Sequence, residues 1–199
     1  MKITPTAIPE VLLLEPRAFS DERGFFMETF QAERYRAAGI AAPFVQDNLS
    51  RSEQGVLRGL HFQHPYGQGK LVYVLEGEVF DVAVDVRRGS PTFGNWVGVY
   101  LDSTKKSQFW IPPGFAHGFC VTSPTALFAY KCTALYSPGT ERSLRWDDPV
   151  IGIDWPLQKV SLSSKDRSAP CLRDLNQGHL PEYQQLPHDR RVYSGSAET

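Results

Sequence analysis

Residues 55–70 place a side chain suited to proton transfer next to side chains that bind anions. The segment reads GVLRGLHFQHPYGQGK, in which His61 stands between Arg58 and Lys70 and four glycines interrupt a strand-like pattern. Histidine is the residue type most able to exchange a proton near neutral pH, and arginine and lysine attract negative charge. The combination predicts proton transfer on a negatively charged substrate. An isolated histidine in a strand is also often a hydrogen-bonded structural residue, and the segment alone leaves both interpretations open.

The neighbouring segments, which must position these side chains, have the composition of β-strands. Residues 70–77 and 78–87 are rich in valine and aromatic residues, and Glu76 and Gly77 between them predict a hairpin turn. In the second segment successive side chains point to opposite faces. One face carries Val79, Asp81, Ala83 and Asp85, and the other carries Phe80, Val82, Val84 and Val86.

Further short strands are expected at regular intervals, with glycine, proline and serine between them. They are residues 95–102, 108–112, 118–122 and 126–136. Strands do not alternate with helices, so the pattern favours an antiparallel sandwich or barrel. One helix is predicted at residues 31–39, with Thr29 as its cap and Gly39 in the left-handed position that ends it. Residues 5–16 are too apolar for a free arm, and we expect them to pair with a partner's sheet.

The composition excludes several classes of protein. The chain has 199 residues, with 21 Lys and Arg against 22 Asp and Glu, and a formal net charge of −1. No long-range field therefore draws it to nucleic acid or to a membrane, and any anion site must be local. Its three cysteines are odd in number and lack metal-ligand spacing, which predicts reduced thiols in a cytoplasmic protein. The N-terminus lacks signal-peptide features, and no stretch approaches the roughly 20 apolar residues of a membrane helix.

The pattern along the chain favours a single domain over residues 1–175, without internal repeats. Residues 176–199 lose periodicity and large aliphatic side chains. We expect them to form a solvated tail or an arm laid over a neighbour.

Motifs of common cofactor sites are absent from the sequence. No glycine pattern leads from a strand into a helix, as dinucleotide and phosphate-loop folds require, and no nucleophile elbow is present. Residues 112–119, PPGFAHGF, match the spacing of the second cupin motif, which implies a double-stranded β-helix, or jelly roll. The cupin metal ligands are missing, because Gln63 and Val121 occupy two expected positions and His64 is one residue out of register. The sequence thus favours an all-β cupin-type fold, with a few short helices and no metal.

A series of collinear segments resembles, in order and spacing, the dTDP-4-dehydrorhamnose 3,5-epimerase family. The resemblance extends from Pro5 to about Asp174, and residues from Leu175 onward have no clear counterpart. The segments are residues 21–30, 44–63, 68–72, 77–87, 90–98, 110–119, 130–136, 146–156 and 162–170.

The resemblance implies a reaction and its catalytic residues. The family's substrate is a dTDP-linked 4-keto-6-deoxyhexose, in which the C3 and C5 protons are both α to the C4 ketone. Epimerisation removes such a proton, holds an enolate and returns a proton to the other face, without a cofactor. By position, His61 matches the base and Asp166 the residue that orients it. Lys70 matches the lysine that stabilises the enolate oxygen, and Tyr130 the acid on the opposite face.

Three of these residues also have structural interpretations that the sequence leaves open. Asp166 could cap a turn after Ser163 and Ser164, Lys70 could be a solvated strand end, and Tyr130 could belong to the core.

The resemblance also implies a substrate-binding set spread along the chain. The matching residues are Arg23, Glu28, Gln46, Asn48, Arg58, His117, Glu141 and Lys165, with Asp47 beside them and Tyr136 expected either to shape the sugar subsite or to pack. Arginine suits a diphosphate because its guanidinium offers charge and paired donors. In the family, the segment with Arg23 and Glu28 reaches a neighbouring subunit's site, which implies a homodimer. Leu49 and Tyr73 depart from the residues common in the family and lie near the pocket by motif.

Three functions follow from these observations. The first is inversion of C3 and C5 of dTDP-4-keto-6-deoxyglucose to give dTDP-4-keto-L-rhamnose. The second is inversion at C3 alone or C5 alone of a dTDP-4-keto-6-deoxyhexose. The third is a non-catalytic or metal-dependent cupin, which would not require His61, Lys70, Tyr130 and Asp166 together.

Overall fold

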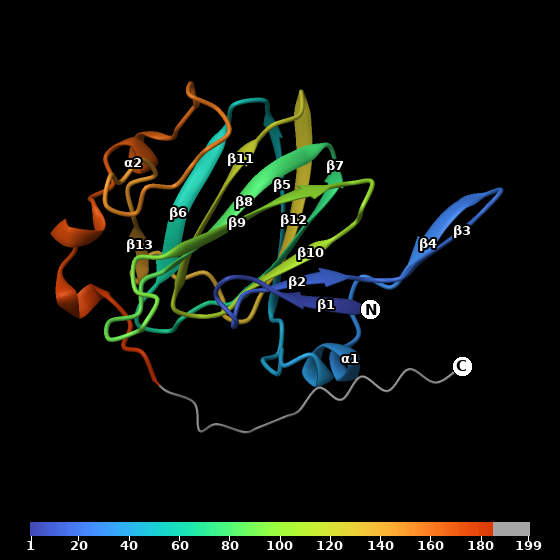
Figure 1. Ribbon diagram of the computed structural model, residues 1–199, viewed down its shortest axis with the longest axis horizontal. Helices are drawn as coiled ribbons and strands as arrows, with labels where there is room; N and C mark the ends of the chain where they lie inside the picture. Colours follow the sequence, from blue (N-terminus) through green and yellow to red (C-terminus); the bar gives the residue numbers. More distant parts are fainter. Residues whose placement is uncertain (185–199) are drawn as a thin grey trace.

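Two antiparallel β-sheets packed face to face form the body of the computed structural model, which describes residues 1–184 (Figure 1). The larger sheet contains, in spatial order, β1 (Lys2–Pro5), β2 (Leu12–Glu15), β10 (Gln108–Ile111), β7 (Lys70–Glu76), β12 (Thr125–Cys132) and β5 (Gln46–Glu53). The smaller contains β13 (Glu141–Ser143), β6 (Leu57–Gln63), β11 (Phe115–Val121), β8 (Glu78–Asp85) and β9 (Trp96–Asp102). The predicted all-β, cupin-type jelly roll is confirmed.

Strand β8 illustrates how alternation in the sequence builds two cores. Val79 and Ala83 pack between the sheets, whereas Val82 and Val84 pack on the outer face of the smaller sheet. The predicted alternation is confirmed, and burying one such valine contributes about 1.5–3 kcal/mol. The outer face is buried because the C-terminal part of the chain folds over it. Its main contacts there are Leu144, Ile151, Trp155, Leu172 and Leu180.

The hairpin predicted at Glu76 and Gly77 is wrong. Strands β7 and β8 belong to different sheets, so the turn between them carries the chain from one layer of the sandwich to the other. Gly77 has a φ of +81°, and a Cβ there would lie 2.0 Å from the Thr125 carbonyl oxygen. The turn therefore requires glycine, as the sequence indicated, but it joins layers rather than neighbouring strands.

The N-terminal segment pairs within its own chain, so its predicted pairing with a partner's sheet is wrong. Strand β2 lies between β1 and β10, with Leu13 opposite Phe109 in the antiparallel register. The apolar side chains find their partners locally, since Val11 and Leu14 are fully buried. Strand β1 then forms the edge of the larger sheet.

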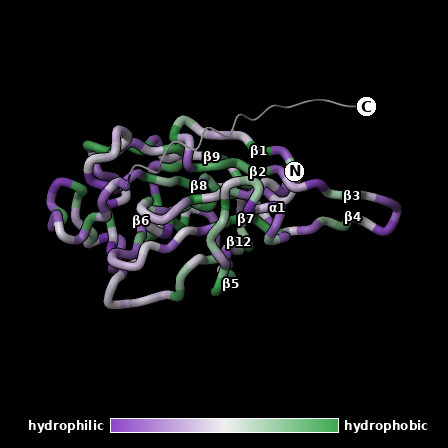
Figure 2. The backbone as a smooth tube through the Cα atoms, turned by 90° about the horizontal axis from the view of Figure 1, so that it is seen from below, coloured by the Kyte–Doolittle hydropathy of each residue, from purple (hydrophilic) through white to green (hydrophobic). Residues whose placement is uncertain are grey.

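A separate hairpin, β3 (Ala18–Asp21) and β4 (Gly24–Met27), projects away from both sheets (Figures 1 and 2). Its aromatic side chains are exposed, with Phe25 at 58% and Phe26 at 72% of their full accessible surface. An isolated two-stranded ribbon is marginally stable by itself.

The predicted helix is present as α1 (Ala32–Ala37), and Gly39 follows it with a φ of +90°. Its cap is Gln31, whose side chain accepts a hydrogen bond from the Arg34 amide, so the assignment of Thr29 is wrong. The Thr29 carbonyl instead accepts hydrogen bonds from Tyr35 and Gln108, which fasten the helix to the larger sheet.

Part of the predicted tail lies on the body of the protein. Leu180 is buried, and the Tyr183 amide donates to the Arg88 carbonyl at 2.9 Å. Arg88 also pairs with Glu182 at 2.7 Å. Residues 185–199, the rest of that segment, lie outside the described residues.

Candidate active site

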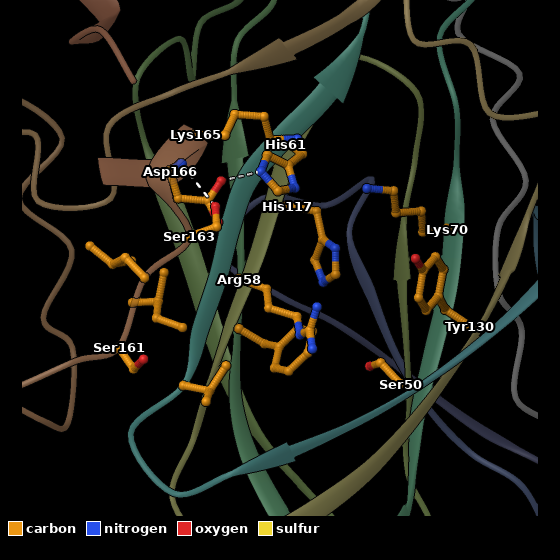
Figure 3. Close-up of a pocket in the computed structure, with 14 residues that line it drawn as sticks. Ser50, Arg58, His61, Lys70, His117, Tyr130, Ser161, Ser163, Lys165 and Asp166 are labelled. Atoms are coloured by element: carbon orange, nitrogen blue, oxygen red, sulfur yellow. Dashed lines mark hydrogen bonds and ion pairs between the residues drawn. The ribbon is translucent and has the colours of Figure 1, made fainter. Parts of the chain in front are cut away.

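A cavity of about 620 Å³ opens between the two sheets, and the predicted catalytic residues line it (Figure 3). A second cavity of about 340 Å³ adjoins it and shares three side chains, those of His61, Lys70 and Tyr130. His61 comes from β6 in the smaller sheet, whereas Lys70 and Tyr130 come from β7 and β12 in the larger sheet. The reactive groups therefore stand at the junction of two chambers, on opposite walls.

His61 forms a short contact with Asp166, although 105 positions separate them in the chain. The His61 Nε2 lies 2.6 Å from Asp166 Oδ1, and Asp166 belongs to the short helix α2 (Ser164–Arg167). The Ser163 hydroxyl caps that helix by accepting from the Asp166 amide at 3.1 Å. The cap is therefore Ser163, and the Asp166 carboxylate is free to hold the imidazole.

The charged form of Asp166 is stabilised in this site. Burial raises the pKa of Asp166, but hydrogen bonding and charge from His61, with smaller contributions from Ser163 and the Gly59 backbone, outweigh it and lower the pKa. A carboxylate held in this way fixes the ring orientation of His61 and favours its protonated form after proton abstraction.

Lys70 stands at the start of β7 with its amine in the cavity wall. Burial lowers the pKa of Lys70, while Cys132, Asp81 and Glu141 act in the opposite direction. Within residues 1–184 the Lys70 ammonium forms no ion pair, because Glu141 is paired with Lys165 at 2.9 Å. Its donors are thus available to a ligand.

Tyr130 faces the cavity from the wall opposite His61 (Figure 3). Its ring packs against Phe128 at a centroid distance of 6.0 Å, so the residue also contributes to the core. Burial raises the pKa of Tyr130, with smaller effects from neighbouring groups. The phenol is therefore protonated at neutral pH and can donate a proton across the cavity to a strongly basic carbon.

Sequence reasoning missed the partner of His117. Both carboxylate oxygens of Asp81, on β8, lie 3.0 Å from His117 Nε2, on the neighbouring β11. Burial raises the pKa of Asp81, opposed by His117 and Lys70, and burial lowers the pKa of His117, opposed by Asp81. The signal was present in the alternation of β8, which put Asp81 between the apolar side chains of Val79 and Ala83 on the inner face.

The second cavity gathers four residues of the predicted substrate-binding set. Gln46, Asn48, Tyr136 and Glu141 line it, and Tyr136 donates to Glu141 at 3.1 Å. Burial raises the pKa of Glu141, but Lys165, His61 and Tyr136 together lower it, so the carboxylate is charged.

The remaining members of the set divide between the first cavity and the outside. Arg58, His117 and Lys165 line the first cavity. Asp47 does not reach either cavity, because alternation along β5 turns it outward to pair with Lys131 at 2.9 Å.

Arg23 and Glu28 line neither cavity of their own chain. Arg23 pairs with Asp21 in the β3–β4 hairpin, and Glu28 pairs with Arg34 of α1. The two departures from the family pattern, Leu49 and Tyr73, line neither cavity, although Leu49 stands on β5 between the lining residues Asn48 and Ser50.

Two further residues were not predicted from the sequence. Ser50 follows Asn48 on the inward face of β5, and its buried hydroxyl has no hydrogen-bond partner among the described residues. Phe119 lines the first cavity and lies opposite Arg58 in the register of β11 and β6. Period-two spacing from Gln46 was the available signal for Ser50.

Residues 1–184 contain no group of three or more His, Cys, Asp or Glu side chains arranged to hold a metal ion. In the same part of the chain, no helix is long and apolar enough to cross a bilayer.

Comparison with known proteins identifies the family. Over residues 5–174 the sequence matches the family described as dTDP-4-dehydrorhamnose 3,5-epimerase. A dTDP-4-dehydrorhamnose 3,5-epimerase of Shigella flexneri is 56% identical over 168 residues, covering 83% of this chain and 93% of the relative.

Solved structures agree with the sequence match. The dTDP-6-deoxy-D-glucose-3,5-epimerase RmlC of Legionella pneumophila, in complex with dTDP-4-keto-L-rhamnose, superimposes with a TM-score of 0.91 at 57% identity, covering 92% of this chain and 99% of that one. ChmJ, a 3'-monoepimerase of Streptomyces bikiniensis in complex with dTDP-quinovose, gives 0.84 at 36% identity, covering 90% and 92%. With a family match over most of its length and more than half of its aligned residues identical to named members, this chain belongs to the dTDP-4-dehydrorhamnose 3,5-epimerase family.

Proposed function

We propose that this chain inverts C3 and C5 of dTDP-4-keto-6-deoxyglucose to give dTDP-4-keto-L-rhamnose, by proton abstraction next to the C4 ketone and reprotonation on the opposite face. The observation that carries the proposal is the 2.6 Å contact between His61 and Asp166 in a cavity that Lys70 and Tyr130 also line. The names and ligand of the similar proteins support the choice of substrate.

In the proposed mechanism His61 removes the proton. Asp166 accepts a hydrogen bond from His61 Nε2, so the other ring nitrogen, Nδ1, carries the lone pair that receives a proton. The charge on Asp166 then stabilises the imidazolium, as its lowered pKa indicates. Loss of the proton from C3 or C5 leaves the electron pair in an enolate on the C4 oxygen.

Lys70 holds that oxygen. An ammonium without another ion-pair partner can direct its donors to a developing oxyanion, and such interactions are worth about 3–4 kcal/mol in comparable sites. Tyr130, on the opposite wall, then returns a proton to the other face of the carbon. The same two residues serve both carbons, because each is α to the same ketone.

The second cavity suits the nucleotide. Gln46 and Asn48 offer amide groups, and Glu141 and Lys165 form a charged pair at its edge. Arg58 lines the first cavity, and its Nε donates to the buried Ser52 hydroxyl at 3.1 Å, which leaves its remaining guanidinium donors available to the diphosphate.

The test is to incubate the purified protein with dTDP-4-keto-6-deoxyglucose in D2O and to identify the product by NMR. Deuterium at both C3 and C5, with both centres inverted, is the expected result. Inversion at one centre alone would establish the monoepimerase alternative, for which ChmJ is the precedent. A product unchanged in both exchange and configuration would refute the proposal.

We further infer a homodimer in which the β3–β4 hairpin of one chain completes the site of the other. The exposed Phe25 and Phe26, and the absence of Arg23 and Glu28 from the lining of both described cavities, support this assembly. An aromatic ribbon that projects into solvent gains most of its burial from a partner.

Mixing two inactive variants tests the exchange of hairpins. Arg23→Ala removes the hairpin contribution and His61→Ala removes the base, so each homodimer is impaired. A mixed dimer contains one intact site of two. If subunits exchange at random in an equal mixture, about half of the dimers are mixed, so about a quarter of wild-type activity should return. A folded mixture without recovery, or a monomer in sedimentation with full activity, would contradict the assembly.

We propose a cytoplasmic location and a single catalytic domain over residues 1–175, followed by a C-terminal arm of which Leu180 and Tyr183 contact the domain. Support for the location comes from the three cysteines, Cys120, Cys132 and Cys171, which are free thiols.

A further inference from the structure

We propose that Gln63 is a positioning residue, which fixes the backbone on both sides of Tyr136 and so holds that ring in the wall of the second cavity. The inference rests on the proposed function, which places the nucleotide in this cavity. Both residues line the cavity. Gln63 stands where the cupin pattern expects a metal ligand, and it has no role in the proposed mechanism.

The segment that carries Tyr136 depends on side chains for its position. Residues 134–137 lie between β12 and β13 and belong to no strand or helix. Leu135 and Tyr136 are 66% and 52% exposed, so little apolar burial holds the segment. Two of its carbonyls and two of its amides are instead bonded to glutamine side chains that line the second cavity, namely Gln46, Gln63 and Gln68. These amides replace the strand ladder that would otherwise satisfy the backbone.

Gln63 bonds this segment on both sides of Tyr136. Its Oε1 accepts from the Ser137 amide at 2.9 Å, and its Nε2 donates to the Leu135 carbonyl at 3.3 Å and to the Tyr66 carbonyl at 3.4 Å. The orientation of the side-chain amide is fixed, because carbonyls only accept and a backbone amide only donates. Gln63 is 5% exposed, so these bonds are made away from water.

Gln46 and Gln68 each hold the segment at a single point. Gln46 Oε1 accepts from the Tyr136 amide at 2.8 Å, and Gln68 Nε2 donates to the Ala134 carbonyl at 2.7 Å. Loss of Gln63 should therefore free more of the segment than loss of either of the other two glutamines.

The side chain of Tyr136 is held at the same place as its backbone. Its hydroxyl donates to Glu141 at 3.1 Å, and Glu141 lies opposite Gln63 in the antiparallel register of β13 and β6. Gln63 thus fixes the backbone of Tyr136 beside the residue that accepts from its hydroxyl. Both contacts together set the ring relative to the cavity.

Hydrogen exchange of individual amides, measured by NMR in the protein without ligand, tests the contact itself. Gln63→Met keeps the length of the side chain and removes its polar groups. We expect exchange of the Ser137 amide to accelerate by about 10–100-fold, because the bond that protects it is lost. The Leu135 amide has no acceptor within residues 1–184, so it is the internal reference and should exchange rapidly in both proteins.

The affinity for dTDP, measured by calorimetry, tests whether the contact acts through Tyr136. Gln63→Met should raise the Kd for dTDP about tenfold, because a displaced ring no longer completes the wall of the cavity. In a Tyr136→Ala background the same substitution should change Kd by less than about twofold, since Gln63 then has no ring to position. A role in stability alone would weaken binding equally in both backgrounds.

Gln54→Met is the matched control. Gln54 is also a glutamine bonded to the backbone, since its Nε2 donates to the Thr122 carbonyl at 2.8 Å, but it lines neither cavity. This substitution should leave both the exchange of the Ser137 amide and the Kd for dTDP as in the wild type.

Several results would overturn the proposal. One is unchanged exchange of the Ser137 amide in folded Gln63→Met, and another is an equal rise in Kd with and without the Tyr136 ring. If the variant does not fold, the wild type decides: a Ser137 amide that exchanges as fast as that of Leu135 contradicts the proposal, and a protected one supports it. Neither measurement needs turnover, so failure of the wild type to epimerise the sugar would refute the proposed function separately.

Discussion

Two histidine–carboxylate pairs serve the same cavity, and the fold holds them in different ways. His61 and Asp166 join a sheet strand to a separate short helix, with side chains 23% and 4% exposed. His117 and Asp81 lie on neighbouring strands of one sheet, with side chains 7% and 0% exposed. The first pair is open to ligand and solvent, and the second is part of the protein interior.

The difference extends to the carboxylates. Burial opposes charge on both, but the pKa of Asp166 is lowered overall because His61, Ser163 and the Gly59 backbone all interact with it. Burial raises the pKa of Asp81 overall, since the opposing effects of His117, its only hydrogen-bond partner among the described residues, and of Lys70 are smaller. A base must exchange protons and therefore needs access, whereas a pair held on neighbouring strands of one sheet has a fixed geometry.

The largest effect on activity is expected from removing the accessible histidine, His61. His61→Ala should abolish deuterium incorporation at both C3 and C5, because one general base typically contributes about 10²–10⁴-fold. His64→Ala is the control, since that histidine lines neither cavity and should retain activity. NMR in D2O would measure both variants, and near-normal exchange at C3 without His61 would exclude it as the base.

The next largest effect is expected at Tyr130, which lies on the cavity wall opposite His61. Tyr130→Phe retains His61, so the enolate still forms and the imidazolium can return a deuteron to the original face. Inversion should fall by about 10²-fold while exchange stays within about tenfold of the wild type. Parallel loss of exchange and inversion would instead assign Tyr130 to packing against Phe128.

The pH dependence of the free energy of unfolding tests Asp166, the carboxylate of the accessible pair. The folded-state pKa of Asp166 is depressed, so its ionised form stabilises the fold above the unfolded-state pKa, and this contribution is lost as pH falls through the folded-state value. Asp166→Asn should lower the free energy of unfolding at pH 7 by about 1–3 kcal/mol. Urea titrations should show this difference shrinking below about pH 4. A difference that is constant from pH 7 to pH 3 would contradict the assignment.

The smallest expected effect concerns the support of Asp166. Ser163→Ala removes the hydroxyl that caps α2 and should cost about 1 kcal/mol in unfolding free energy. Ser164→Ala, at the exposed next position, is the matched control and should cost less than half of that. Equal losses in thermal unfolding for the two serines would show that the cap does not hold the helix.

The local pattern of the sequence predicted most strands but not which of them pair. Alternation in residues 78–85 correctly separated the two faces of β8, since each side chain's direction follows from strand geometry. The turn at Gly77 was recognised, yet whether it joins neighbours or layers depends on sheet order, which residues distant in the chain decide. Residues 5–16 were recognised as strand-forming and apolar. Their partner strand β10 lies about a hundred residues further along the chain, so the local pattern could not show that β2 pairs with it.

The residue types of the site can be read from the sequence: a histidine, a lysine and a tyrosine on strands, together with the family to which they belong. The contact of Asp166 with His61 across 105 positions, and that of Asp81 with His117, could be seen only in the folded chain. The physical reason is that side-chain direction is a local property of a strand, whereas contact between side chains requires the register and order of strands far apart in the chain. Burial then sets the charge of each group, because desolvation depends on every element that covers it.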